Sequence, residues 1–180
     1  MAAIVLLTSI LAIATGVLAL SANPRRTVNQ CFFLFATCFG LGMLSIYGAM
    51  KAGAMFANDG TTDPIPWLRG SAILGNFLPA LLALNCDAIR FPLLHRRELL
   101  WRNSPWLAIG LGMSVIALTA FFIPEDSTHY NRKRGAGYFI IAAALGISYI
   151  TIIIRSLTQL RTLKGIRKLE LQFLMLLFAS

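Results

Sequence analysis

The stretch Ala3–Leu20, AIVLLTSILAIATGVLAL, contains no charged side chain. An α-helix rises about 1.5 Å per residue, so a run of this length nearly crosses the roughly 30 Å hydrocarbon core of a bilayer. A secretory signal peptide has positive charge before its apolar run, whereas here Arg25 and Arg26 follow it. The stretch therefore predicts a first membrane-spanning helix with its N-terminus outside.

Four further apolar runs are long enough to span, and a fifth one begins near the end of the chain. The expected spans are residues 3–20, 31–50, 67–89, 106–122 and 138–157, followed by a partial span at 169–180. Barrel strands alternate in polarity and are about ten residues long, so these continuous runs indicate helices. The predicted fold is one all-α transmembrane domain over residues 1–180, a polytopic helical bundle with five full spans and the start of a sixth.

The composition agrees with a membrane protein. Of the 180 residues, 57% are hydrophobic and 13% are charged, against about 25% charged in soluble domains. The net charge of +9 does not indicate nucleic-acid binding, because the basic residues lie in short loops where membrane orientation explains them. The lipid bilayer is thus the expected partner, and no nucleic acid is expected.

The loop charges predict the orientation. The first, third and fifth loops are basic, and the second contains Asp59 and Asp63. The fourth loop is mixed, since Arg132, Lys133 and Arg134 follow its acidic residues. Cytoplasmic loops are enriched in Lys and Arg, so the odd loops are expected inside and the N-terminus outside.

The sequence contains no pattern typical of an enzyme. Cys31, Cys38 and Cys86 form no CxxC pair, and His95 and His129 are predicted on opposite sides of the membrane. No Gly-rich phosphate loop precedes a basic residue. We therefore expect this chain to have no catalytic residue, cofactor or metal.

Four polar or helix-breaking residues within the spans are candidates for a pocket or hinge. Asn76 and Pro79 lie in the middle of the third span, where proline frees a carbonyl that Asn76 could help to satisfy. Tyr47 and Lys51 are four residues apart at the outer end of the second span, where they could meet an anionic or aromatic ligand. The alternatives are a packed kink for the first pair and a Lys51 side chain that reaches the interface for the second.

The third span ends with an acid and a base. Asp87 and Arg90 are three residues apart, so they can pair on one helix face. An acid in a membrane segment suggests function, but this position is expected at the level of the headgroups. A structural pair at the membrane boundary is the preferred interpretation.

Two segments resemble a known family. They are SANPRRTVNQCFFLFATCFGLGMLSIYGAM at residues 21–50 and LRTLKGIRKLELQFLMLL at residues 160–177. Together they resemble the N-terminal seven-transmembrane region of bacterial histidine kinases and related signalling proteins, in which an Asn-Pro-Arg-like turn follows the first span and a GIRR-x-Q-like segment opens the sixth. Here Glu170 stands about where Gln is common, and Gln172 comes later.

The resemblance implies a function and a location. A family member completes the sixth span, adds a seventh and continues into a cytoplasmic output domain, so the chain is expected to be truncated in its sixth span. It would be a sensory or input module in the bacterial cytoplasmic membrane, with an output domain as its partner and a homodimer possible. The alternative is a structural or accessory subunit of a larger membrane complex, and a transporter is the weaker third hypothesis because only one mid-span Asn/Pro site is present.

Overall fold

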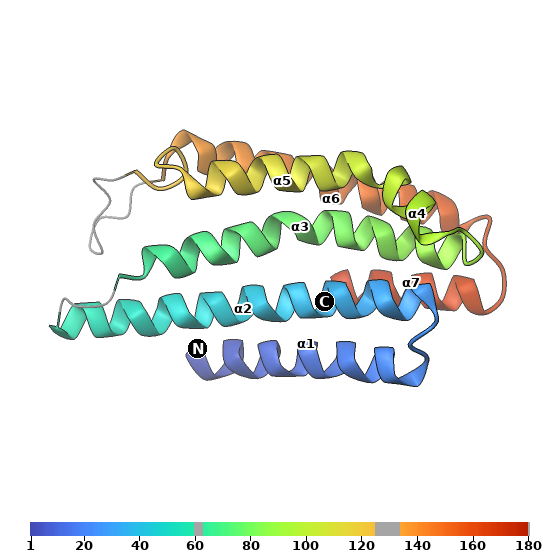
Figure 1. Ribbon diagram of the computed structural model, residues 1–180, viewed down its shortest axis with the longest axis horizontal. Helices are drawn as coiled ribbons and strands as arrows, with labels where there is room; N and C mark the ends of the chain where they lie inside the picture. The colour runs from blue at the N-terminus through green and yellow to red at the C-terminus, as the bar shows by residue number, and fades with distance from the viewer. Residues whose placement is uncertain (60–62, 125–133, 180) are drawn as a thin grey trace.

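The computed structural model describes residues 1–59, 63–124 and 134–179 (Figure 1). These ranges form helices and contain no strand, so the all-α prediction is confirmed for them. The helices are α1 (Ala2–Ala22), α2 (Thr27–Asp59), α3 (Ile65–Arg90), α4 (Arg96–Arg102), α5 (Ser104–Leu118), α6 (Ala136–Leu160) and α7 (Ile166–Ala179). His129, Arg132 and Lys133 of the fourth predicted loop lie outside the described residues.

Among the described residues, four helices are long and apolar enough to cross a membrane: α1, α2, α3 and α6. The fourth predicted span, residues 106–122, corresponds to α5, which has 15 residues and ends at Leu118. At about 1.5 Å per residue α5 is roughly 22 Å long, shorter than a typical hydrocarbon core. Its backbone becomes extended at Thr119, whose hydroxyl donates to the carbonyl of Ile116. Five full spans are therefore not confirmed.

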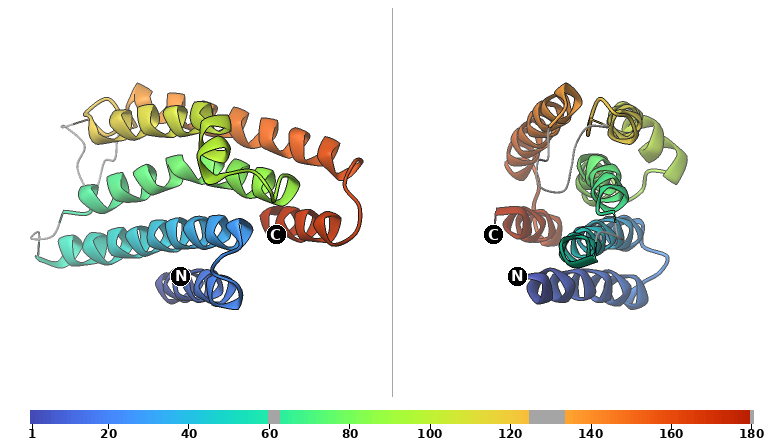
Figure 2. Two further views of the ribbon diagram at one scale, coloured as in Figure 1. Left: turned by 45° about the vertical axis from the view of Figure 1, so that its right-hand side comes forward. Right: turned by 90° about the vertical axis from the view of Figure 1, so that its left-hand side faces the viewer.

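The long helices α2, α3 and α6 lie side by side along one long axis, and α1 lies against α2 at an angle to that axis (Figures 1 and 2). α1 packs on α2, α2 packs on α3, and α3 packs on α5 and α6, while α7 contacts α3 and α6. The turn between α1 and α2 is closed by the side chain of Gln30, whose Nε2 donates to the carbonyl of Pro24 at 2.6 Å. The Asn-Pro-Arg turn thus reverses the chain directly between two long helices.

The first, third and fifth loops meet at the same end of the bundle (Figure 1). Basic side chains dominate there. The cations in these loops and the adjoining helix ends are Arg25, Arg26, Arg90, Arg96, Arg97, Arg102, Arg155, Arg161, Lys164, Arg167 and Lys168, and the acids are Asp87, Glu98 and Glu170. We call this part of the molecule the basic end.

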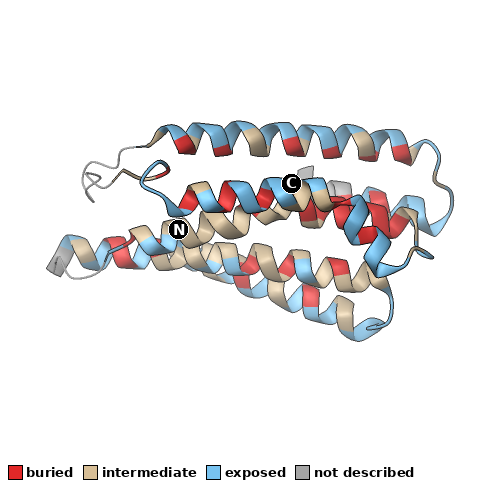
Figure 3. Cartoon of the chain, turned by 45° about the horizontal axis from the view of Figure 1, so that its top comes forward, coloured by how far each residue is buried: buried red, intermediate tan, exposed pale blue. Residues whose placement is uncertain are grey.

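The core is densest at the basic end. In the second half of α3 the residues from Leu82 to Ile89 are all buried, whereas only Ser9 and Gly16 are buried in α1 (Figure 3). One buried cluster joins α3, α6 and α7, and it consists of Leu82, Ala83, Cys86, Ile89, Ile152, Leu171 and Leu174. The second half of α3 is therefore the central element against which later helices pack.

The segment predicted as a partial sixth span is helical. α7 follows Gly165, whose φ of 62° is a left-handed conformation that glycine adopts without a Cβ clash. Leu171 and Leu174 are buried against the core, while Leu169 and Phe173 are each 65% exposed. The segment therefore packs one face on the bundle, and its position in a bilayer remains a prediction.

Candidate functional site

The candidate site is a charged cluster around Asp87, in the last turn of α3. The neighbouring apolar residues Leu84, Ala88 and Ile89 are at most 4% exposed, and the carboxylate itself is fully buried. A buried carboxylate is stable only when it is paired and hydrogen-bonded. The structure therefore has to supply partners for Asp87 from other elements.

Three side chains meet the carboxylate. Arg155 Nη2 of α6 lies 2.6 Å from Oδ1, and Arg102 Nε of α4 lies 3.2 Å from Oδ2. Asn103 Nδ2, between α4 and α5, donates to Oδ2 at 3.1 Å. We call Asp87, Arg102, Asn103 and Arg155 the Asp87 cluster. It connects α3, the α4–α5 junction and α6.

The positive charges of the Asp87 cluster offset the unfavourable position of Asp87 at the C-terminal end of a helix. The C-terminal end of a helix carries a partial negative charge, so an acid in the last turn of α3 is repelled by the helix dipole. The guanidinium groups of Arg102 and Arg155 compensate both the dipole and the carboxylate. Their side chains are 44% and 30% exposed, respectively, so Arg155 is the more deeply held partner.

The predicted direct pair of Asp87 with Arg90 is not among the ion pairs of the described residues. The Arg90 guanidinium instead lies over the ring of Phe91 at 4.8 Å, and Arg102 lies over the same ring at 4.5 Å. With its amide oxygen turned towards the arginines, Gln159 accepts from Arg90 Nη1 and from Arg155 Nε, both at 3.2 Å. Arg90 thus joins the network through Gln159, because the Asp87 carboxylate is directed towards α4 and α6.

Two further contacts join distant elements near this end. Cys86 Sγ and Ser156 Oγ are 3.3 Å apart, which adds a second polar contact between α3 and α6. Arg26, just before α2, pairs with Glu170 of α7 at 2.6 Å. The loop between α1 and α2 is therefore linked to α7 by this ion pair.

Asn76 and Pro79 form a different kind of site. Asn76 is 1% exposed, and its amide nitrogen and oxygen have no hydrogen-bond partner among the described residues. The expected bond from Asn76 to a carbonyl freed by Pro79 is therefore not formed. The ribbon of α3 bends near its middle (Figures 1 and 2), while the size of the kink at Pro79 stays a prediction.

α5 approaches α3 closely beside Asn76. A Cβ added to Gly110 would lie 2.9 Å from the backbone oxygen of Asn76. Ser114, one turn further along α5, donates to the carbonyl of Gly110 at 2.8 Å. The backbone of Asn76 thus lies at a tight crossing of α3 and α5.

Tyr47 and Lys51 lie at another level of the bundle. They flank Gly48, where an added Cβ would meet the ring of Trp67 at the beginning of α3. Trp67 precedes Asn76 by nine residues, or about 13 Å along a helix. Lys51 is exposed and Tyr47 is half-buried, so the structure does not bring these two residues together with Asn76 and Pro79.

Sequence reasoning missed Arg102, Asn103 and Arg155 as site residues. Arg155 carried a signal, because it follows Ile152, Ile153 and Ile154 inside the last two turns of an apolar helix. An ionisable residue in such a place needs a partner.

No family model, curated protein or solved structure matches the chain in the three comparisons. In the part of the chain that the structure describes, no three His, Cys, Asp or Glu residues lie close enough together to hold a metal ion. The geometry of the Asp87 cluster is therefore the main basis for a functional proposal.

Proposed function

We propose that the chain is a membrane-embedded sensory or input module that passes a signal to an output region on the cytoplasmic side. The observation that carries this proposal is the Asp87 cluster. One buried carboxylate holds α3, the α4–α5 junction and α6 together at the end where α7 begins. The resemblance of residues 21–50 and 160–177 to membrane regions of histidine kinases supports the same function.

The mechanism is a population shift between two packings of the bundle. A signal received in the half that contains Tyr47, Lys51 and Asn76 changes the bend of α3 near Pro79. Asp87 lies only eight residues beyond Pro79, so the bend moves the carboxylate relative to Arg155. α6 continues from Arg155 through a short linker into α7, which transmits the change towards the output region.

The orientation belongs to this proposal. The N-terminus lies outside, and the basic end faces the cytoplasm of a bacterial cell, because Lys and Arg are enriched in cytoplasmic loops. A cysteine in place of Asp59 is expected to react with an impermeant maleimide in intact cells, and a cysteine in place of Arg97 only after lysis. The opposite pattern would show that the orientation is inverted.

A second function is favoured by one observation. α1 presents large exposed apolar side chains on most of its surface, including Ile4, Leu7 and Leu18, and buries only two residues against the rest of the chain. Such a face suits lipid or another membrane subunit. An accessory subunit of a larger complex would use it for assembly, and a homodimer would use it symmetrically.

Distance measurements test the sensory mechanism. Spin labels at the exposed positions Arg97 and Lys164 report the separation of α4 from the α6–α7 linker in nanodiscs, and unsubstituted protein gives the background from the native cysteines. The proposal expects Asp87→Asn to shift the distance distribution towards a second population. An unchanged distance distribution would mean that the Asp87 cluster only stabilises one packing of the helices, and it would favour the accessory-subunit function.

A further inference from the structure

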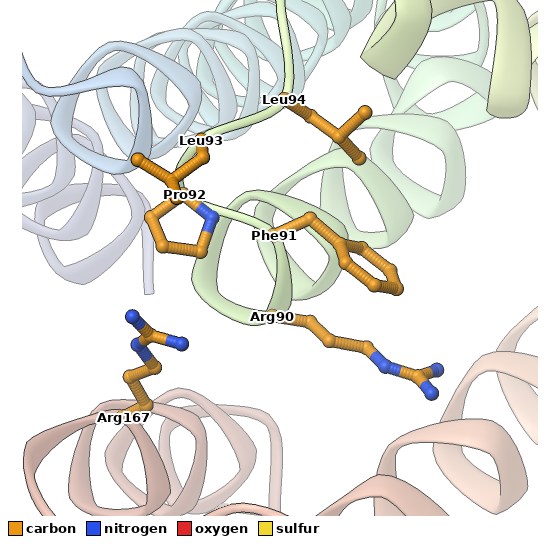
Figure 4. Close-up of a pocket in the computed structure, with 6 residues that line it drawn as sticks. All are labelled: Arg90, Phe91, Pro92, Leu93, Leu94 and Arg167. Atoms are coloured by element: carbon orange, nitrogen blue, oxygen red, sulfur yellow. The ribbon is translucent and has the colours of Figure 1, made fainter.

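A shallow cavity of about 350 Å³, open to the surface, lies at the basic end, between the α3–α4 turn and the first turn of α7. Its lining residues are Arg90, Phe91, Pro92, Leu93, Leu94 and Arg167 (Figure 4). Ligand sites begin at about 300 Å³, so the cavity is large enough for a small headgroup. It lies next to the Asp87 cluster but does not include its members.

Of the two arginines that line the cavity, Arg167 is the one available to bind an anion. Arg167 extends from α7 towards Pro92, whereas Arg90 runs past Phe91 and away from Arg167 (Figure 4). Arg90 is already stacked on Phe91, while Arg167 forms no ion pair within the described ranges. Arg167 also lies in the first turn of α7, where the helix dipole favours an anion.

The other walls of the cavity are apolar. Phe91, Pro92, Leu93 and Leu94 form the turn after α3, and the side chain of Leu93 is 98% exposed. Apolar walls would contribute nothing to the binding of a free phosphate. A fully exposed leucine side chain is also unfavourable in water. At the end of a membrane-spanning helix, however, such a side chain contacts the hydrocarbon just below the headgroups. A cation beside an apolar wall at this depth matches an amphiphilic anion.

We propose that this cavity binds the headgroup of an anionic phospholipid. Arg167 donates two hydrogen bonds to the phosphate, as a guanidinium does to phosphates generally. Leu93 and Leu94 contact the glycerol and the first acyl carbons. Arg90 and Lys168 add positive charge nearby, which repels the ammonium group of a zwitterionic headgroup and so favours an anionic lipid. This site does not depend on the proposed sensory function.

Lipid titration followed by native mass spectrometry tests the proposal. The purified 180-residue chain is titrated in detergent with phosphatidylglycerol or phosphatidylcholine, and Kd is obtained from the lipid-bound fraction. Phosphatidylglycerol is expected to bind the more tightly. Arg167→Ala is expected to weaken its binding about tenfold, which corresponds to the loss of charge-assisted hydrogen bonds.

Arg161→Ala is the matched control, because it removes the same charge from the same end but does not line the cavity. It is expected to change Kd by less than about twofold, the size expected for a surface charge. Equal losses of affinity in both variants would mean that the lipid is attracted by the basic surface in general, and would overturn a specific site at Arg167. Equal binding of the two lipids would overturn headgroup selection.

A third arm separates lipid from free phosphate. Inorganic phosphate in excess is not expected to displace phosphatidylglycerol, because it makes no contact with Leu93 or Leu94. Displacement that requires Arg167 would assign the cavity to a free phosphate and overturn the lipid proposal. Unchanged elution of Arg167→Ala in size-exclusion chromatography checks that the exposed substitution leaves the fold intact.

Discussion

Asn76 and Asp87 lie eleven residues apart in α3 and are equally buried, yet their surroundings are opposite. Asp87 is held by two cations and an amide, whereas the amide of Asn76 has no hydrogen-bond partner among the described residues. Three helical turns separate them, so both lie on nearly the same face of α3. The difference indicates that α3 is anchored through ion pairs at its basic end. Near its middle, the contacts from neighbouring helices are packing and weaker hydrogen bonds to backbone carbonyls, from Cys38 to Leu74 and from Ser114 to Ile73.

The largest effect on stability is expected when the Asp87 cluster is disrupted. Asp87→Ala leaves Arg155 and Arg102 without their shared anion, and removing one partner of a buried ion pair is strongly destabilising. The free energy of unfolding in detergent is expected to fall by about 3 kcal/mol, since the arginines are partly exposed. Glu98→Ala, an exposed acid on α4, serves as the control and should change stability by less than about 0.5 kcal/mol. Equal effects of the two substitutions would contradict the anchoring role.

The tight crossing beside Asn76 is the next largest target. Gly110→Ala places a Cβ about 2.9 Å from the Asn76 backbone oxygen, so α5 and α3 have to separate. Overpacking of this kind destabilises by about 2 kcal/mol. Gly112→Ala is the matched control, because nothing lies within 4 Å of its added Cβ, and alanine is the better helix former. Thermal unfolding should separate the two variants, and equal midpoints would show that the helices are not in close contact.

The two cations of the Asp87 cluster are expected to differ. Arg155→Ala removes the shorter and more buried contact and should lower the free energy of unfolding by about 2 kcal/mol. Arg102→Ala removes a longer and more exposed contact and should lower it by about 1 kcal/mol. Chemical unfolding of both variants measures the order. A larger loss for Arg102→Ala would mean that α4, rather than α6, is the main anchor of Asp87.

The smallest effect is expected at Asn76. Asn76→Leu removes a buried amide with no hydrogen bond to lose and replaces it with an apolar group of similar size. Stability is expected to stay constant or to rise by up to about 1 kcal/mol, because the desolvation penalty disappears. Asn103→Leu, which loses bonds to Asp87 and to the Leu99 carbonyl, should instead destabilise by about 1 kcal/mol. A marked loss of stability in Asn76→Leu would reveal a polar partner for this amide.

The sequence pointed to Asp87 as a site residue but did not identify the partners of its carboxylate. Asp87 was singled out as an acid at the end of an apolar run, with a structural pair as the preferred interpretation. The nearest cation in sequence, Arg90, was the natural choice at helical spacing, but Asn103 and Arg155 follow Asp87 by 16 and 68 residues. Only the packing of α4 and α6 on α3 brings these side chains to the carboxylate.

The sequence by itself determined the all-helical character, the approximate positions of the long helices and the concentration of basic residues in alternate loops. These features follow from local properties, namely run length, hydropathy and the placement of charge. The tertiary structure decided that α5 ends at Leu118, that the backbone of Asn76 lies at the Gly110 crossing and that Asp87 pairs with Arg102 and Arg155. Each of these depends on which helix faces lie against one another, and an apolar helix of low amphipathicity does not encode its neighbours in its own pattern.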